Sequence, residues 1–155
     1  MPDLSLSQDD SRFIDDIASL LTPWGMPQVA ARLYGYLLLS AEAVTLDQIS
    51  EELGVSKSGA SVAARLLEKH SLARRFGERG TKRVFYEASD SYGGVLMDQV
   101  SLLGSVARLL QNRAPQLTSD LSRERLNQAS TFYLTVRDAM EAGVLDAMKA
   151  VEKGD

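Results

Sequence analysis

The sequence predicts a mainly α-helical (α+β) fold, a winged helix-turn-helix with a two- or three-stranded wing that is flanked by N- and C-terminal helices. Three local patterns lead to this prediction. Thr45 and Gln48 have the spacing of a capping box, and Gly54 suits the left-handed turn after the short helix that this box begins. Ser56 can cap a second helix directly after that turn. Two β-prone runs follow, separated by the glycine-containing segment 77–81.

Two helices are expected before the helix-turn-helix. Ser7 or Asp9 can cap the first, which should run to about Leu21 with its apolar residues on one stripe. The segment 22–27 contains two prolines and a glycine, and it breaks this helix. The second helix should cover 27–39, with its proline as the first residue. Because it is apolar almost all round, we expect it to be central in the fold.

The second helix of the helix-turn-helix is expected over 57–70. Its inward positions are small or aliphatic, whereas its outward positions are polar or charged apart from one valine. Two helices joined by so short a turn can present the second one to a groove. The outward residues are Lys57, Ser58, Ser61, Val62 and Arg65.

The wing is predicted from two β-prone runs, 72–76 and 82–86, with Arg79 at or near the tip of the hairpin. Its outward side chains carry a high density of positive charge, which suits a phosphate backbone better than a core. They are Arg74, Arg75, Arg79, Lys82 and Arg83.

Charge is distributed unevenly along the chain. The 155 residues carry a net charge of −4, with a sequence pI near 5.1. Residues 54–87 nevertheless hold eight Lys/Arg against three Glu, a net +5, which leaves −9 for the rest. One basic face on an acidic body fits a protein that docks nucleic acid with a single surface. The alternative is a solvated charge cluster on a surface hairpin.

After the wing, a helix over about 92–113 has apolar residues on two faces and therefore needs two neighbours. A final helix over about 121–151 has a narrow seam with 3-4 spacing, which either faces this chain's own helices or makes a twofold dimer. The length of these helices favours the dimer. The seam residues are Leu126, Ala129, Tyr133, Val136, Met140, Gly143, Ala147 and Ala150.

The predicted organisation is an N-terminal dimerisation helix (1–25), a winged helix-turn-helix domain (26–88) and a C-terminal helical dimerisation region (89–155). No apolar run reaches the eighteen residues of a membrane span, and the N-terminus lacks the pattern of an export signal, so we expect no membrane association and a cytoplasmic location.

An enzyme is not expected. The chain has no cysteine and a single histidine, His70, which removes thiol chemistry, His-based triads and multi-His metal sites. No glycine-rich loop of the P-loop or dinucleotide type is present. We therefore predict no catalytic residues, no cofactor and no metal site, and the helix-turn-helix suggests binding as the function.

The sequence predicts double-stranded DNA as the partner, read as a pseudo-palindromic site by a homodimer. Lys57, Ser58, Ser61 and Arg65 would meet the major groove, with Val62 against a thymine methyl. Ser56 and its helix N-terminus would favour a phosphate. Arg79 would enter or skirt the minor groove, while Arg74, Lys82 and Arg83, with Arg75 as a further candidate, would hold phosphates. The alternative is a winged-helix module that binds an acidic protein and no DNA.

Four segments carry a resemblance to a known family: 25–27, 31–39, 53–58 and 64–68. With the charged wing, they resemble the MarR superfamily of winged-helix transcription regulators, and within it the GbsR-type branch. The resemblance covers most of the chain. It implies a homodimeric regulator, commonly a repressor, whose DNA affinity a small-molecule effector alters.

Aromatic side chains could form the walls of an effector pocket, since aromatic faces hold choline-type cations. Aromatic residues at helical spacing equally suit a core. The candidates are Trp24, Tyr34, Tyr36 and Tyr92.

Overall fold

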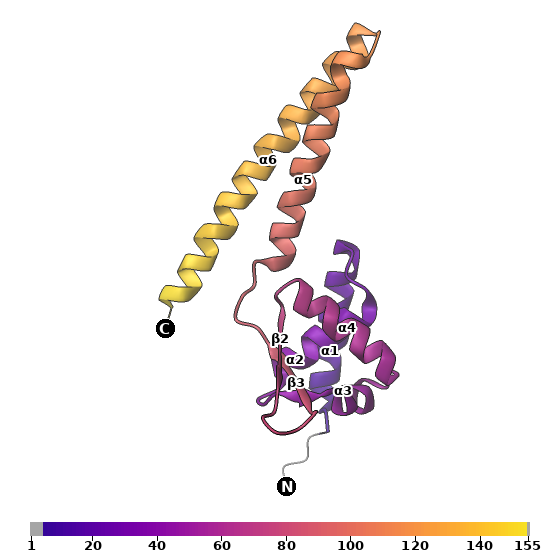
Figure 1. Cartoon of the computed structure of the whole chain (residues 1–155), viewed down its shortest axis with the longest axis vertical. Helices are drawn as coiled ribbons and strands as arrows, with labels where there is room; N and C mark the ends of the chain where they lie inside the picture. The colour runs from indigo at the N-terminus through magenta and orange to yellow at the C-terminus, as the bar shows by residue number, and fades with distance from the viewer. Residues whose placement is uncertain (1–4, 155) are drawn as a thin grey trace. The chain divides into compact units, whose positions relative to one another are not determined.

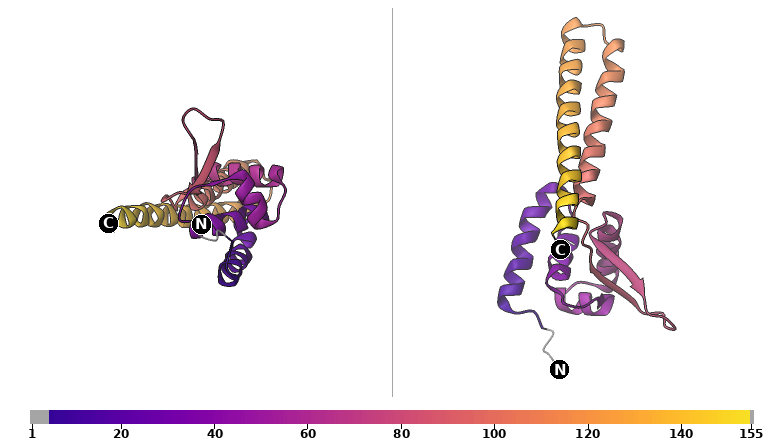
Figure 2. Two further views of the ribbon diagram at one scale, coloured as in Figure 1. Left: turned by 90° about the horizontal axis from the view of Figure 1, so that it is seen from below. Right: turned by 90° about the vertical axis from the view of Figure 1, so that its left-hand side faces the viewer.

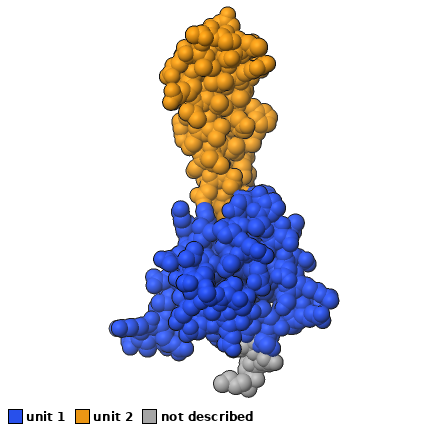
Figure 3. Space-filling view, turned by 90° about the vertical axis from the view of Figure 1, so that its right-hand side faces the viewer, with its two compact units in different colours: residues 1–90 blue, residues 91–155 orange. Residues whose placement is uncertain are grey.

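The computed structural model describes residues 5–154 and divides the chain into two compact units, 1–90 and 91–155 (Figure 3). The first unit contains five helical segments and three strands among its described residues (Figure 1). They are α1 (Gln8–Leu21), the 3-10 turn η1 (Thr22–Trp24), α2 (Gln28–Leu39), β1 (Val44–Thr45), α3 (Leu46–Leu53), α4 (Lys57–Lys69), β2 (Ala73–Gly77) and β3 (Val84–Ala88). The second unit consists of α5 (Gly94–Arg113), the 3-10 turn η2 (Ala114–Gln116) and α6 (Asp120–Lys153).

Helix α1 begins with a capping box at Ser7. Its hydroxyl accepts from the Asp10 amide at 3.0 Å, and the Asp10 carboxylate accepts from the Ser7 amide at 3.1 Å. Ile14 and Ala18 are almost fully buried, because α1 packs on α2. The segment predicted as a dimerisation helix therefore contributes to the core of the first unit.

Helix α2 is central in this unit, as its nearly all-round apolar character predicts, and packs against both α1 and α4. Its first helical residue is Gln28, and Pro27 occupies the capping position just before it. Gly35 lies against α1 so closely that a Cβ there would stand 2.7 Å from Ile17 Cγ2. The largest fully buried side chains come from four different helices: Ile14, Leu33, Leu37, Ile49 and Leu67.

The sheet has three antiparallel strands in the order β1-β3-β2, which resolves the predicted choice between two and three. Arg75 lies opposite Tyr86, and Gly77 lies opposite Val84. Both long strands begin later than predicted, by one residue in β2 and two in β3. The later start of β3 follows from the reversal, which takes residues 78–83 because the Glu78 amide donates to the Arg83 carbonyl at 3.1 Å.

The second unit is an antiparallel helical hairpin of α5 and α6 (Figures 1 and 2). On α5, Val100, Gly104 and Ala107 are buried, as one of its two predicted apolar faces requires. The Ser130 hydroxyl of α6 donates to the Ala107 carbonyl at 3.0 Å, which joins the two helices. Within residues 5–154, no helix combines the length and the apolar character that a membrane-spanning helix needs.

The seam predicted on α6 is only partly covered by α5. The deeply buried positions are Ser130 and Val144, so the side of α6 that faces α5 is rotated relative to the predicted seam. Arg137 belongs to this side, because a Cβ on Gly104 would lie 3.2 Å from its Cδ. The far edge of the seam is exposed: Val136, Gly143, Ala147 and Ala150. Packing of α6 on this chain's own α5 thus accounts for one edge of the predicted seam only.

Candidate nucleic-acid interface

Helix α4 has one buried and one exposed side. Ala60, Ala63, Ala64 and Leu67 are buried, and α4 packs on α2 and α3 through this side. On the opposite side Val62 is 61% exposed, although it is apolar. The predicted outward residues Lys57, Ser58, Ser61, Val62 and Arg65 all lie on this side, with Ser61 half-buried and the others exposed.

The turn between α3 and α4 is held by several local contacts. Gly54 has a φ of 64°, a left-handed conformation that suits glycine. The Ser56 hydroxyl accepts from the Gly59 amide at 3.0 Å and caps α4. Arg32 of α2 donates to the Leu53 carbonyl at 3.2 Å and so occupies a free acceptor at the end of α3. These contacts fix the direction in which α4 points.

The hairpin of β2 and β3 projects beyond the helices of its unit (Figure 2). Gly80 has a φ of 83° at the tip, next to Arg79. Thr81 links both sides of the loop, since its amide donates to the Glu78 carbonyl at 3.2 Å and its hydroxyl accepts from the Arg83 amide at 3.2 Å. Arg79, Lys82 and Arg83 are thus presented together by one short loop.

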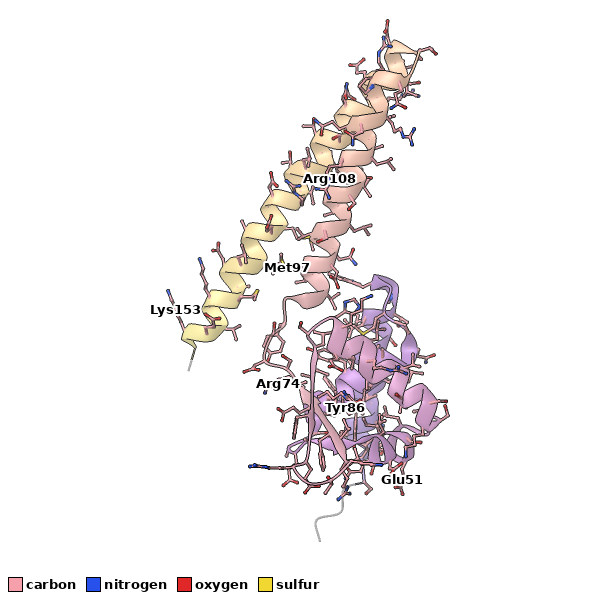
Figure 4. The ribbon with its side chains drawn as sticks, in the orientation of Figure 1. Glu51, Arg74, Tyr86, Met97, Arg108 and Lys153 are labelled. Carbon is pink, nitrogen blue, oxygen red and sulfur yellow. The ribbon has the colours of Figure 1, made fainter. Side chains whose placement is uncertain are left out.

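The two arginines at the start of β2 lie on opposite faces of the sheet. Arg74 lies on the outer face, with Nη2 3.1 Å from Glu87 Oε1 and Nη1 3.6 Å from Asp90 Oδ1 (Figure 4). Arg75 shares its face with Tyr86, which is buried under the helices. Because two carboxylates already occupy Arg74, the geometry favours Arg75 over Arg74 as the phosphate contact of β2.

Arg75 and Arg65 line the same hollow, of about 340 Å³, between α4 and the sheet. The sequence predicts both as outward cations but does not predict that they lie beside the same hollow. The alternation of side chains along β2, which puts Arg74 and Arg75 on opposite faces, is the sequence signal that points to this arrangement. The lining combines apolar, polar and charged side chains: Leu46, Ser61, Arg65, Glu68, Arg75, Val84 and Tyr86.

Most cations of this surface have no acidic partner. Among residues 5–154, no carboxylate lies within ion-pair distance, 4.0 Å, of five of them. Those five are Arg65, Arg75, Arg79, Lys82 and Arg83. Lys57 differs, because its Nζ lies 3.0 Å from Asp47 Oδ1. Aromatic contacts orient the Arg83 side chain. Its guanidinium lies over the Phe85 ring at 5.8 Å from the centroid, and Phe85 stacks on Phe76.

The four aromatic residues predicted for an effector pocket lie in different environments. Trp24 and Tyr92 are 57% and 51% exposed, and they belong to different units. Tyr36 is only 6% exposed, and burial, followed by the nearby Glu52 charge, raises the pKa of its phenol. Tyr34 is half-buried on the same helix. Tyr36 is therefore a core side chain in this structure.

Between residues 5 and 154, no cluster of three or more His, Asp or Glu side chains could hold a metal ion.

The chain matches no protein-family model. It is 29% identical over 87 residues to YvaV of Bacillus subtilis (strain 168), named as an HTH-type transcriptional regulator, covering 56% of this chain and 49% of YvaV. It is 26% identical over 83 residues to the HTH-type transcriptional repressor OpcR of the same strain, covering 54% and 45%. The chain thus spans about half the length of these relatives.

A solved structure of a transcriptional regulator superposes with a TM-score of 0.76, at 16% identity, covering 91% of this chain and 99% of that one. The fold is a winged helix-turn-helix. The sequence relatives are helix-turn-helix transcriptional regulators. The predicted fold class is therefore confirmed. A sequence identity of 16% to this solved structure supports a shared fold and no more.

Proposed function

We propose that this protein is a sequence-specific, double-stranded DNA-binding transcriptional regulator that acts as a homodimer. One observation carries the proposal: five cations from α4, β2 and the wing loop have no acidic partner among the described residues, although the chain is acidic overall. Because the chain has more carboxylates than cations, it could have paired these surface cations internally. A surface whose cations have no carboxylate partner is suited to bind a polyanion, and the exposed side chains of α4 are suited to contact the edges of bases.

The reading of bases is assigned to α4, and the holding of phosphates to the hairpin. Arg65 and Ser61 have the hydrogen-bonding groups that major-groove edges need, and exposed Val62 suits a thymine methyl. Arg79 is proposed for the minor groove beside that site, and Arg75, Lys82 and Arg83 for phosphates. The Ser56 cap and the amides that begin α4 add a further phosphate position.

The homodimer is proposed from apolar surface on the helical hairpin. Leu102 and Leu109 lie one heptad apart on the α5 face turned away from α6, and they are 56% and 58% exposed. On α6, Phe132 is 63% exposed and Val136 is 37% exposed. A second copy of the chain would cover such a stripe, and twofold symmetry would place two reading heads on a pseudo-palindromic site, about 34 Å apart.

Repression and a small-molecule effector complete the proposal. OpcR is named a repressor, and we extend that mode of action to this chain, together with membership of the GbsR-type branch of the MarR superfamily. An effector can act only by binding one arrangement of the two heads better than the other. Trp24, Tyr34 and Tyr92 remain candidate contacts, and Tyr36 would become one only if α2 moved.

The DNA part is tested by fluorescence anisotropy with a random-sequence duplex between 50 and 200 mM salt, followed by selection of bound sequences from a random pool. We expect affinity to fall steeply with salt and an enriched inverted repeat to bind more tightly than random DNA. Salt-independent or absent duplex binding would refute the proposal and favour an acidic protein as the partner.

The dimer is tested by sedimentation equilibrium of the double variant Leu102→Lys/Leu109→Lys. We expect it to be monomeric, because two charges replace apolar surface in the interface. Leu39→Lys on α2, at a position 41% exposed, is the matched control and should remain dimeric. A dimeric double variant would exclude this α5 face as the interface.

A further inference from the structure

The ion pair between Asp47 and Lys57 lies at the edge of the proposed DNA-reading surface. Asp47 is in the first turn of α3, and its Oδ1 is 3.0 Å from the Lys57 Nζ at the start of α4. Its neighbour Leu46 lines the same hollow as Ser61 and Arg65. The first turn of α3 therefore borders the exposed side of α4, and a duplex that meets Arg65 comes close to Asp47.

Folding stability does not account well for this pair. Both side chains are largely exposed, 66% for Lys57 and 78% for Asp47, and exposed pairs contribute little to stability because solvent screens them. The Asp47 charge also favours the N-terminus of α3, but the Thr45 capping box already satisfies amide donors there.

This inference rests on the proposed function: we propose that Asp47 neutralises Lys57 and so weakens the binding of this surface to DNA of arbitrary sequence. On a random duplex, Lys57 can contribute only attraction to phosphates. A carboxylate 3.0 Å from its ammonium group cancels much of that attraction and repels the phosphate itself. The protein then relies on the five cations that make no ion pair among residues 5–154, which are Arg65, Arg75, Arg79, Lys82 and Arg83.

Counterion release sets the size of the expected effect. Each phosphate contact contributes about 0.9 to the slope of log affinity against log salt. A fourfold change of salt, from 50 to 200 mM, therefore changes affinity by about 3.5-fold for each contact. Freeing Lys57 should add about one contact of this kind for each reading head on the duplex.

The experiment measures anisotropy of a mixed-sequence 24-base-pair duplex with wild type, Asp47→Asn and Glu51→Gln. Glu51 is the matched control, since it is exposed on the same helix, its loss changes net charge equally, and it makes no ion pair with the described residues (Figure 4). We expect Asp47→Asn to bind at least threefold more tightly than Glu51→Gln at 50 mM salt, with a slope steeper by about one unit for each reading head on the duplex.

The same comparison in a Lys57→Gln background separates the pair from general electrostatics. We expect the advantage of Asp47→Asn to disappear there, because no ammonium group remains to be released. Equal affinities of Asp47→Asn and Glu51→Gln, or a gain that persists without Lys57, overturns this inference while salt-dependent binding of wild type upholds the proposed function. Absence of duplex binding by every variant overturns both.

Discussion

Two adjacent arginines give a sharp test of how the hairpin meets DNA. Arg74 and Arg75 have the same chemistry, and Arg→Ala at either position removes one positive charge from the same strand. They differ in their surroundings, since Arg74 lies within 3.1 and 3.6 Å of Glu87 and Asp90, whereas Arg75 faces the hollow beside Arg65. We predict that Arg75→Ala weakens DNA binding much more than Arg74→Ala.

The magnitude follows from the number of unpaired cations. On a random duplex all five unpaired cations can contact phosphates. At about 0.9 for each contact, they predict a wild-type slope near −4.5 for one reading head and about twice that for a dimer with both heads on the duplex. Arg75→Ala should reduce the slope by about 0.9 for each head that is bound, so its defect should be larger at 50 mM than at 200 mM salt by about 3.5-fold for one head and more for two. Arg74→Ala should leave the slope nearly unchanged, because its guanidinium is already neutralised by two carboxylates.

The assay is anisotropy of a labelled random duplex at four salt concentrations, with urea denaturation of each variant as the check on folding. Arg74 is 57% exposed in its ion pairs, so its removal should cost no more than about 1 kcal/mol of stability. An equal or larger loss of slope for Arg74→Ala would refute the assignment of the two faces of the sheet.

Three further predictions concern stability. Ser71 ends α4 at a φ of 60°, where glycine is favoured, so Ser71→Gly should raise the free energy of unfolding by about 0.5–1 kcal/mol in urea denaturation; a loss would contradict this. Gly35→Ala should lower it by about 1–3 kcal/mol, because the new Cβ meets Ile14 Cα at 3.3 Å as well as the Ile17 side chain, whereas Gly143→Ala in open space should not. Burial raises the pKa of Tyr36, so stability present below pH about 10, the ordinary tyrosine value, should be lost as pH rises through the folded pKa. Tyr36→Phe should flatten that loss in thermal unfolding between pH 9 and 11, and an unchanged profile would assign it to other groups.

The structural features that the sequence predicts correctly are those controlled by local interactions. A cap joins residues three apart, so Thr45 with Gln48 and Ser56 with Gly59 could be inferred from spacing alone. Gly54 could be predicted in a left-handed turn because it lies directly after one short helix and two residues before the cap of the next. The outward side of α4 likewise follows from helical periodicity, and the structure agrees for each of its predicted residues.

The predictions that were wrong concern features that are set by contacts between distant segments. The extent of the reversal, which moves Lys82 and Arg83 from strand into loop, is set by a hydrogen bond across the hairpin. The side of α6 that is buried is set by its fit to α5, including the close approach of Arg137 to Gly104. Periodicity alone shows that a helix has an apolar side but does not show which neighbour covers it.

The sequence by itself determined that this chain forms a winged helix-turn-helix with a concentrated basic surface, because caps, turns and side-chain periodicity act over a few residues. Only the tertiary structure decided which of those cations are available. Register places Arg74 beside Glu87, and helix packing places Lys57 beside Asp47. Charge pairing depends on distances of a few ångströms between elements, and the order of residues along the chain does not fix such distances.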